Sequence, residues 1–202
     1  MRARTSPHGT QFGPYTVLDL HQLPEDGKGF ELEDGWLIEV AASSRHNWVL
    51  RTVARIIEAA ATTAGSQAVT CDGGEWEIST PTGVRKPDVL LIPREVARAA
   101  IIEESPRLIP GTELHLVAEV VSPGSGSERT DRLRKVGEYA RLGIPQYWII
   151  EHSPRLAIHV LTLTDGAYTA APPVLEGTTF TAVIEADKPI TVTFDPADLL
   201  DF

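Results

Sequence analysis

The spacing of apolar and polar positions changes along the chain and separates predicted strands from predicted helices. Apolar segments flank Glu33-Asp34-Gly35 in GFELEDGWLIEVA, which predicts a β-hairpin with a tight turn. Residues 45–64 instead carry apolar side chains at helical spacing. Ser43 and Ser44 precede this stretch and Gly65 follows it. The pattern predicts an amphipathic helix with a serine N-cap.

The middle of the chain alternates strand-like and helix-like patterns. Two strand-like runs, 68–80 and 83–93, are separated by a turn at residues 81–83, and a short helix or loop follows at 93–105. The apolar run LHLVAEVV then leads through a Gly/Ser-rich loop into a helix that ends at Gly143, followed by QYWIIE. This order predicts a strand–helix–strand unit whose two strands are parallel and buried.

Beyond residue 155, short apolar runs alternate with turns, which indicates antiparallel strands. We therefore expect a mixed α/β fold, with one β-sheet flanked by helices and an antiparallel C-terminal extension. Residues 1–24 are polar and contain Pro and Gly, with one short amphipathic piece at VLDLHQLP. They are predicted to form an N-terminal arm, and residues 25–202 a single domain.

Composition narrows the class of protein. Hydrophobic residues make up 42% of the 202 residues and charged residues 23%, as in globular proteins with a real core. No apolar run approaches the roughly 20 residues that span a bilayer, and the N-terminus lacks the apolar region of a signal peptide. The single cysteine, Cys71, cannot form an internal disulfide. We expect a cytoplasmic protein with no membrane partner.

The charge is acidic overall but uneven. The formal net charge is −10, which argues against a monomer that binds nucleic acid through a basic surface. Residues 151–202 hold eight acidic and two basic residues, whereas residues 129–141 hold five basic and two acidic ones. The basic segment keeps a nucleic-acid partner possible, most readily if a dimer brings two such helices together.

Two carboxylates lie in apolar surroundings. Glu119 stands near the end of LHLVAEVV, and Asp88 opens the run DVLLIP. A buried carboxylate is costly unless it is paired, and a hard divalent cation between two carboxylates would satisfy both. A salt bridge from Lys135 or an arginine would also satisfy Glu119, and Asp88 after a proline is a common turn residue. Asp131, Lys135 and Tyr139 share one helix face, so Lys135 also has a plain i, i+4 partner.

The pattern Pro87-Asp88, Glu119-Val-Val121 and Lys135 resembles the PD-(D/E)XK signature of restriction-endonuclease-like proteins, with Val121 where that signature has its lysine. More closely, the chain resembles the Uma-two family of restriction endonuclease-like proteins over about residues 15–200. The matching segments are FELEDGWLIEV, SSRH, RKPDVLLI and EVVSPGSGSERTDRLRKVGEYARLGIPQYWII.

The resemblance implies a restriction-endonuclease-like fold and an endonuclease that uses Mg²⁺ or Mn²⁺ to hydrolyse phosphodiester bonds in DNA. It implies that Asp88 and Glu119 bind the metal, helped by the carbonyl of Val120, with Glu31 as a further acidic residue. Lys135 would be the catalytic lysine, moved from the strand to the helix. Many proteins of this superfamily are dimers, so a homodimer is expected.

Four neighbouring side chains are predicted to contact the substrate: Arg45, His46, Asp131 and Tyr139. The plainer alternatives are a helix-start role for His46 and core packing for Tyr139. Two rival functions also stay open. One is a non-catalytic interaction module that retains the nuclease scaffold, favoured by the acidic tail and by Val121. The other is a metal-dependent hydrolase of small phosphoesters.

Overall fold

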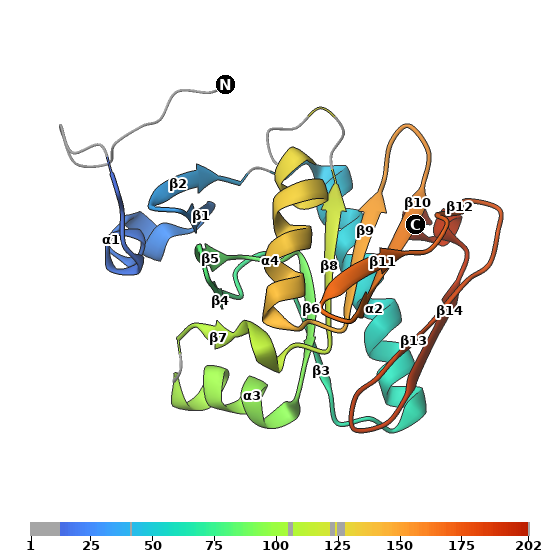
Figure 1. Cartoon of the computed structure of the whole chain (residues 1–202). Coiled ribbons are helices and arrows are strands. Elements are labelled where there is room, and N and C mark those ends of the chain that lie inside the picture. Colours follow the sequence, from blue (N-terminus) through green and yellow to red (C-terminus); the bar gives the residue numbers. More distant parts are fainter. Residues whose placement is uncertain (1–12, 41, 105–106, 122–123, 125–127, 202) are drawn as a thin grey trace.

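The computed structural model describes residues 13–40, 42–104, 107–121, 124 and 128–201 (Figure 1). Most of the predicted N-terminal arm and most of the Gly/Ser loop, at 122–123 and 125–127, lie outside the described residues. Within the arm, Val17–His21 of the amphipathic piece VLDLHQLP form a short helix, α1. Thr16 caps it by accepting a hydrogen bond from the backbone N–H of Asp19.

A central sheet has the strand order β11-β10-β9-β8-β6-β3, and β12 pairs with β10. Its strands are β3 (Val69–Asp72), β6 (Val89–Ile92), β8 (Leu116–Val121), β9 (Gln146–Glu151), β10 (Ala157–Thr164), β11 (Ala167–Ala170) and β12 (Val174–Leu175). β8 and β9 are parallel, whereas the other pairs are antiparallel. The predicted parallel crossover is therefore confirmed.

A second sheet has the strand order β2-β1-β5-β4-β7. Its strands are β1 (Phe30–Glu33), β2 (Trp36–Glu39), β4 (Ile78–Thr80), β5 (Gly83–Arg85) and β7 (Ile109–Pro110). The turn between β1 and β2 has positive φ at Asp34 (47°) and Gly35 (75°), the conformation that favours Asp-Gly in two-residue hairpins. The predicted hairpin is confirmed.

The two strand-like runs at 68–80 and 83–93 are each divided between the sheets, which the sequence did not predict. Gly73 and Gly74 have positive φ (99° and 65°) and separate β3 from β4. Pro87 lies between β5 and β6, and a proline cannot donate to a strand ladder. Because each run crosses from one sheet to the other, Asp88 lies at the junction between them.

The long helix α2 (Ser44–Ala64) begins and ends as predicted. The hydroxyl of Ser43 accepts from the backbone N–H of His46 at 3.1 Å, and Gly65 closes the helix with a φ of 63°. The second predicted helix contains a π-helical turn, Thr130–Arg134, followed by α4 (Lys135–Leu142), which ends at Gly143. The segment after β6 forms α3 (Arg94–Arg98) and a further π-helical turn, Ala99–Glu103.

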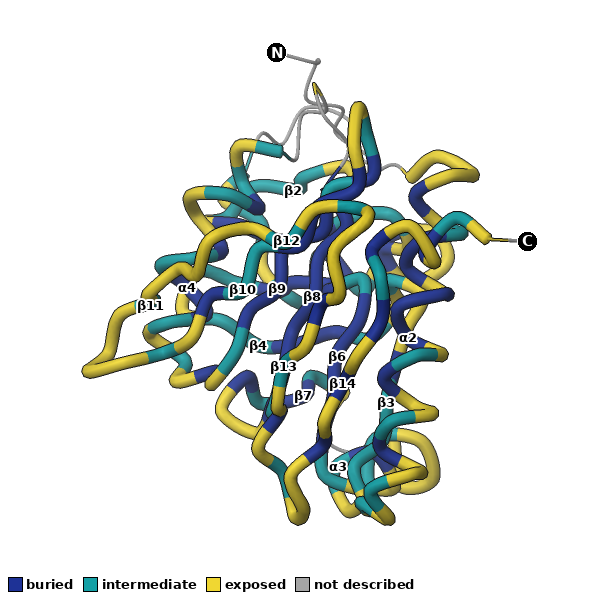
Figure 2. Tube along the Cα trace, turned by 90° about the vertical axis from the view of Figure 1, so that its right-hand side faces the viewer, coloured by how far each residue is buried: buried dark blue, intermediate teal, exposed yellow. Residues whose placement is uncertain are grey.

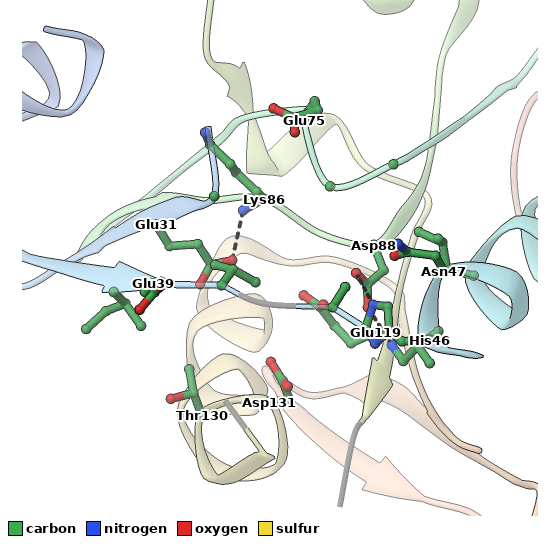
Figure 3. Close-up of a pocket in the computed structure, with 18 of the residues that line it drawn as sticks. Glu31, Glu39, His46, Asn47, Glu75, Lys86, Asp88, Glu119, Thr130 and Asp131 are labelled. Atoms are coloured by element: carbon green, nitrogen blue, oxygen red, sulfur yellow. Dashed lines mark hydrogen bonds and ion pairs between the residues drawn. The ribbon is translucent and has the colours of Figure 1, made fainter. Parts of the chain in front are cut away.

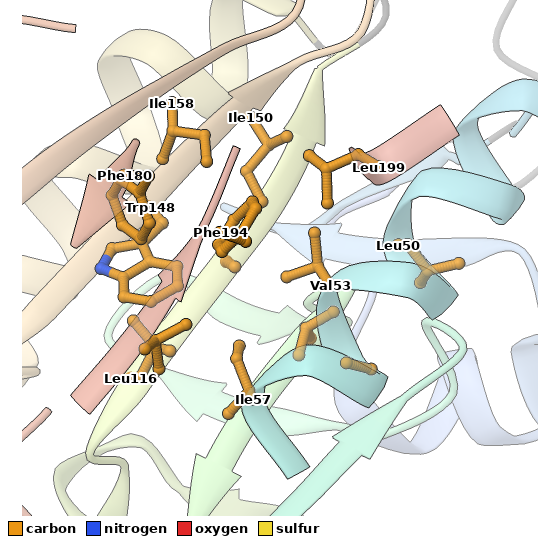
Figure 4. Close-up of a cluster of buried hydrophobic side chains, with 14 of the residues drawn as sticks. Leu50, Val53, Ile57, Leu116, Trp148, Ile150, Ile158, Phe180, Phe194 and Leu199 are labelled. Atoms are coloured by element: carbon orange, nitrogen blue, oxygen red, sulfur yellow. The ribbon is translucent and has the colours of Figure 1, made fainter. Parts of the chain in front are cut away.

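Helices cover both faces of the central sheet (Figure 1). One face carries α2 and the hairpin β13 (Phe180–Ile184) and β14 (Ile190–Phe194), packed on Leu116, Ala118 and Val120 of β8 (Figure 4). The other face carries α4, with Tyr139 packed near Val117 and Val121. Since side chains alternate along a strand, Glu119 faces α4.

The antiparallel C-terminal extension is confirmed, and it is part of the core. β10 continues the central sheet beside β9, and Phe180 and Phe194 of the last hairpin pack in the same cluster as Trp148. Figure 2 shows this buried centre between β8, β9, β6 and α2. Cys71 of β3 is buried on the opposite face of the sheet, in the same cluster as Leu90 and Tyr139, and burial raises the pKa of its thiol to about 12. Across the described ranges, no helix combines the length and the apolarity needed to cross a membrane.

Candidate active site

Strand pairing brings Asp88 and Glu119 to the same edge of the central sheet. β6 and β8 are antiparallel with Val89 opposite Ala118, so the residue before β6 lies beside the carboxyl end of β8. Oδ2 of Asp88 accepts a hydrogen bond from the backbone N–H of Val120 at 2.7 Å. Asp88 is therefore tied directly to the strand that carries Glu119.

Lys135 reaches Glu119 from the helix side. Its Nζ donates to Oε1 of Glu119 at 2.8 Å, and the hydroxyl of Tyr139 donates to the same oxygen at 2.9 Å. Glu119 and Lys135 are each only 4% exposed. The side chain of Val121 is fully buried on the α4 side of β8, so α4 supplies the amine that this strand position lacks. The expected return of Lys135 to the strand end is observed.

The Lys135 ammonium lies among three carboxylates. Besides Glu119, it pairs with Asp131 at 3.0 Å and with Glu31 at 3.2 Å, and both are buried. Burial alone would lower the pKa of Lys135, but Asp131, Glu119 and Glu31 raise it well above its usual value. Lys135 is thus held charged, as a cation shared by three acidic residues from β1, β8 and the π-helical turn.

An arginine network that the sequence analysis did not predict lies behind these residues. Arg85 is fully buried and donates to Glu138 at 2.8 and 2.7 Å, to Glu31 at 3.1 Å and to Glu33 at 2.6 Å. The backbone N–H of Lys86 donates to the other oxygen of Glu31 at 3.0 Å. Both oxygens of Glu31 are therefore engaged. The one available signal was an arginine within the strand-like run 83–93, in a chain rich in acidic residues.

His46 contacts Asp88 from the start of α2. Its Nε2 lies 3.0 Å from Oδ1 of Asp88, and since a carboxylate accepts, Nε2 carries the proton. Although burial lowers the pKa of His46, the hydrogen bond and charge of Asp88 raise it above the usual value. Nδ1 is buried and has no hydrogen-bond partner among the described residues. Both oxygens of Asp88 are therefore fixed, one by α2 and one by β8.

These groups surround a cavity of about 460 Å³ between the two sheets (Figure 3). Its wall includes Glu31, His46, Lys86, Asp88, Glu119, Val120, Asp131 and Lys135. Of the four predicted substrate contacts, His46 and Asp131 line the cavity. Arg45 is exposed and lies between two lining positions, Ala42 and His46. Tyr139 is fully buried behind Glu119, away from the cavity wall.

Negative charge is in excess around Glu119. Burial raises the pKa of Glu119 well above its usual value, and Asp131, Asp88 and Glu31 raise it further against the opposing effect of Lys135. Burial likewise raises the pKa of Asp131. For Glu31 the opposite holds: burial is outweighed by Lys135 and Arg85, which lower its pKa. A further cation beside Glu119 and Asp88 would relieve the repulsion.

The donor set fits a hydrated divalent cation. Across residues 13–201, leaving out the gaps, no group of three or more His, Cys, Asp or Glu side chains is arranged to hold an ion. Mg²⁺, however, is commonly bound by one or two carboxylates and keeps several waters. Asp88, Glu119 and a backbone carbonyl at Val120 supply that kind of oxygen set. Because Lys135 already pairs with Glu119, the cation is not needed to satisfy this carboxylate alone.

Two comparisons place the chain among known proteins. The family model of the Uma-two proteins, described as "Putative restriction endonuclease", matches residues 17–187. A crystal structure described as "a putative nuclease belonging to DUF820 from Anabaena variabilis" covers 92% of this chain and 97% of its own. It matches with a TM-score of 0.61 at 14% sequence identity, a likeness that confirms the mixed α/β fold. The search of curated proteins found no match.

Proposed function

The chain belongs to the Uma-two family, described as "Putative restriction endonuclease", and from this membership we propose that it is a Mg²⁺-dependent endonuclease that hydrolyses phosphodiester bonds in DNA. The observation that carries the proposal is the contact of Lys135 with Glu119, beside Asp88, in one cavity. Asp88, Glu119 and Lys135 thus lie together as the two acids and the lysine of the PD-(D/E)XK pattern would, although Val121 stands at the usual lysine position. Fold alone would not support this step, because one fold serves many functions.

In this proposal Asp88, Glu119 and the carbonyl of Val120 hold Mg²⁺ or Mn²⁺. When bound, such an ion supplies a nucleophilic water at neutral pH and stabilises charge on phosphate oxygens. His46 and the Val120 N–H keep the Asp88 carboxylate fixed in the cavity, at 3.0 and 2.7 Å. Tyr139 does the same for Glu119 at 2.9 Å. A fixed first set of ligands reduces the reorganisation needed during the reaction.

Lys135 is proposed to supply positive charge to the phosphate that reacts. Its ammonium is buried at the cavity wall, where the partial exclusion of water strengthens its field. Asp131 and Glu31 hold the amine in place, so we assign them positioning roles. Glu31 also stays in the proposal as a further acidic residue beside the metal, with one oxygen accepting from Arg85 and the other from the backbone N–H of Lys86. Tyr139 also becomes a positioning residue, whereas Arg45 remains a proposed phosphate contact at the cavity mouth.

A homodimer remains part of the proposal, with weaker support than the sequence suggested. Of the basic residues in 129–141, Arg132 pairs with Glu128 and Glu151, Arg134 pairs with Glu33, and Lys135 is buried. Among the described residues, only Arg129 and Arg141 in that segment make no ion pair. A dimer channel built from α4 would therefore offer less free positive charge. The cytoplasmic location also remains a proposal, which the buried thiol of Cys71 fits.

The direct test is hydrolysis of labelled DNA with and without divalent ions. We expect cleavage with Mg²⁺ or Mn²⁺, and loss of it with EDTA that is restored by adding the ion back. Single strands, duplexes, RNA and a chromogenic phosphodiester should be compared in the same buffer. Turnover of the chromogenic ester alone would favour a small-phosphoester hydrolase. An inactive protein that still binds DNA would favour the interaction module.

One observation specifically favours that non-catalytic alternative. Lys135 already neutralises Glu119, Asp131 and Glu31 at 2.8 to 3.2 Å, so the site is internally paired. A scaffold that had lost its metal would look the same. The surplus of carboxylates over cations around Glu119 is the feature that argues for a metal.

A further inference from the structure

The groups proposed to react are recessed inside the cavity. Glu119, Lys135 and Asp131 are each 4% exposed, and the side chain of Asp88 is 14% exposed. A phosphate that reacts beside Glu119 and Lys135 must therefore enter the cavity. A DNA backbone that lies only on the protein surface does not reach Glu119 or Lys135.

The cavity is partly open and is lined by segments between residues 28 and 135. Its wall is made by β1 and the residues before it, the end of β2, the start of α2, the β3–β4 loop, the β5–β6 connection, the end of β8, the π-helical turn and the start of α4 (Figure 3). Its volume is about 460 Å³. The cavity fits a ligand of about nucleotide size, within the usual range of small-molecule sites. It does not fit a double helix.

The charge of the cavity wall also disfavours a double helix. Six carboxylates line the cavity (Glu31, Glu39, Glu75, Asp88, Glu119 and Asp131) against three lysines (Lys28, Lys86 and Lys135). Each lysine already pairs with an acid: Lys28 with Glu75, Lys86 with Glu77 and Lys135 with three carboxylates. A duplex carries one negative charge per about 1.7 Å of axis, twice the density of one strand. The wall therefore repels a duplex more strongly than a single strand.

One part of the wall is apolar. Ile38, Val40, Ala42 and Leu50, from β2, the segment after it and α2, contribute apolar side chains to the wall. Such a surface can accept the face of a base or sugar, while the acid and lysine side takes the phosphate. Gly73 and Gly74 also line the cavity and leave open space, since an added Cβ at either would meet no atom within 4 Å.

From the recessed acids, the cavity size and the wall charge, we propose that the site takes one unpaired nucleotide unit of DNA at a time. Its substrates are single strands, flaps and frayed ends, and the interior of an intact duplex is excluded unless a nucleotide is drawn out of the helix. This inference rests on the proposed nuclease function.

The test compares three DNA substrates of one sequence with the full chain and Mn²⁺: a single strand, a blunt duplex, and a duplex with an unpaired flap. We expect the single strand and the flap to be cleaved at least about tenfold faster than the duplex interior. Equal cleavage inside the blunt duplex would overturn the inference and leave the nuclease function standing. Hydrolysis of none of the three would count against the nuclease function itself, and the inference would fall with it.

Entry through the cavity is tested by narrowing its mouth. Val40, 37% exposed on the wall, is replaced by tryptophan, and Val183, 43% exposed on the distant hairpin β13, is the matched control. We expect Val40→Trp to lower kcat/KM for the flap by about tenfold or more, and Val183→Trp to change it by less than about twofold. Ala42→Trp serves as the second mouth variant if Val40→Trp fails to fold. Equal rates for the mouth and control variants would contradict the inference.

Discussion

Replacing Lys135 with methionine is expected to destabilise the protein by about 3–5 kcal/mol, the range for removing one partner of a buried ion pair. Methionine keeps much of the side-chain volume but leaves Glu31, Glu119 and Asp131 without their shared cation. These acids then lie buried and close together, so their ionised forms are disfavoured. Chemical denaturation at neutral pH, followed by circular dichroism, measures the loss.

The control for this substitution is Lys188→Met. Lys188 is exposed beyond β13, so its replacement is expected to change the free energy of unfolding by less than about 0.5 kcal/mol. The double variant Lys135→Met with Glu119→Gln tests the cause. Because the second change removes one stranded charge, the double variant should be less destabilised than the sum of its singles. Additive losses would show that Lys135 stabilises the fold by packing alone.

Glu119→Gln and Asp88→Asn are each expected to lower divalent-dependent hydrolysis on the order of a thousandfold. Metal-ion stabilisation is worth several kcal/mol, and each 1.36 kcal/mol of barrier is about a tenfold change in rate. Both substitutions keep the side-chain shape, so Tyr139 and the Val120 N–H retain oxygen acceptors. The measurement is single-turnover cleavage of labelled DNA at saturating Mn²⁺.

Glu185→Gln is the matched control for these two variants. Glu185 is exposed between β13 and β14, far along the chain from the proposed site, and its replacement should leave the rate unchanged within about twofold. Thermal unfolding of all three variants separates loss of activity from loss of fold. Full activity in folded Glu119→Gln or Asp88→Asn protein would remove the residue concerned from the proposed metal site.

The local parts of the site were predictable from sequence because they depend on helix and strand periodicity. Asp131 and Lys135 are four residues apart on one helical stretch, and their contact is observed at 3.0 Å. Glu119 is placed by its position in an apolar strand, and the strand–helix–strand order brings Lys135 back over that strand. The π-helical turn at Thr130–Arg134 did not disturb this contact.

The parts that depend on distant pairing were not predictable in this way. Arg85 meets Glu31, Glu33 and Glu138, which lie 52 to 54 residues away along the chain. No periodicity links such positions, and an arginine in a strand-like run has many possible acidic partners in a chain with 28 acidic residues. For the same reason, the sequence did not predict that runs 68–80 and 83–93 are each divided between two sheets. The spacing of apolar residues predicts that a segment forms a strand, but it does not determine which strand it pairs with.

For Tyr139, the helical spacing predicted a position near Lys135 but did not determine its role in the site. Its position predicted a place near Lys135, and the structure puts its hydroxyl 2.9 Å from Glu119. Its full burial then makes it a support for that carboxylate rather than a surface for substrate. Burial depends on how α4 packs against β9, where Tyr147 meets Tyr139 edge to face at 5.0 Å. That packing is a tertiary property.

The most direct test of the account is the location of Mn²⁺ in crystals soaked with that ion, from its anomalous scattering. The account predicts one ion bound by oxygens of both Asp88 and Glu119 at about 2.0–2.2 Å, with Lys135 still within reach of the site. Clear density for Glu119 paired only with Lys135 and Tyr139, with no ion at saturating Mn²⁺, would contradict it.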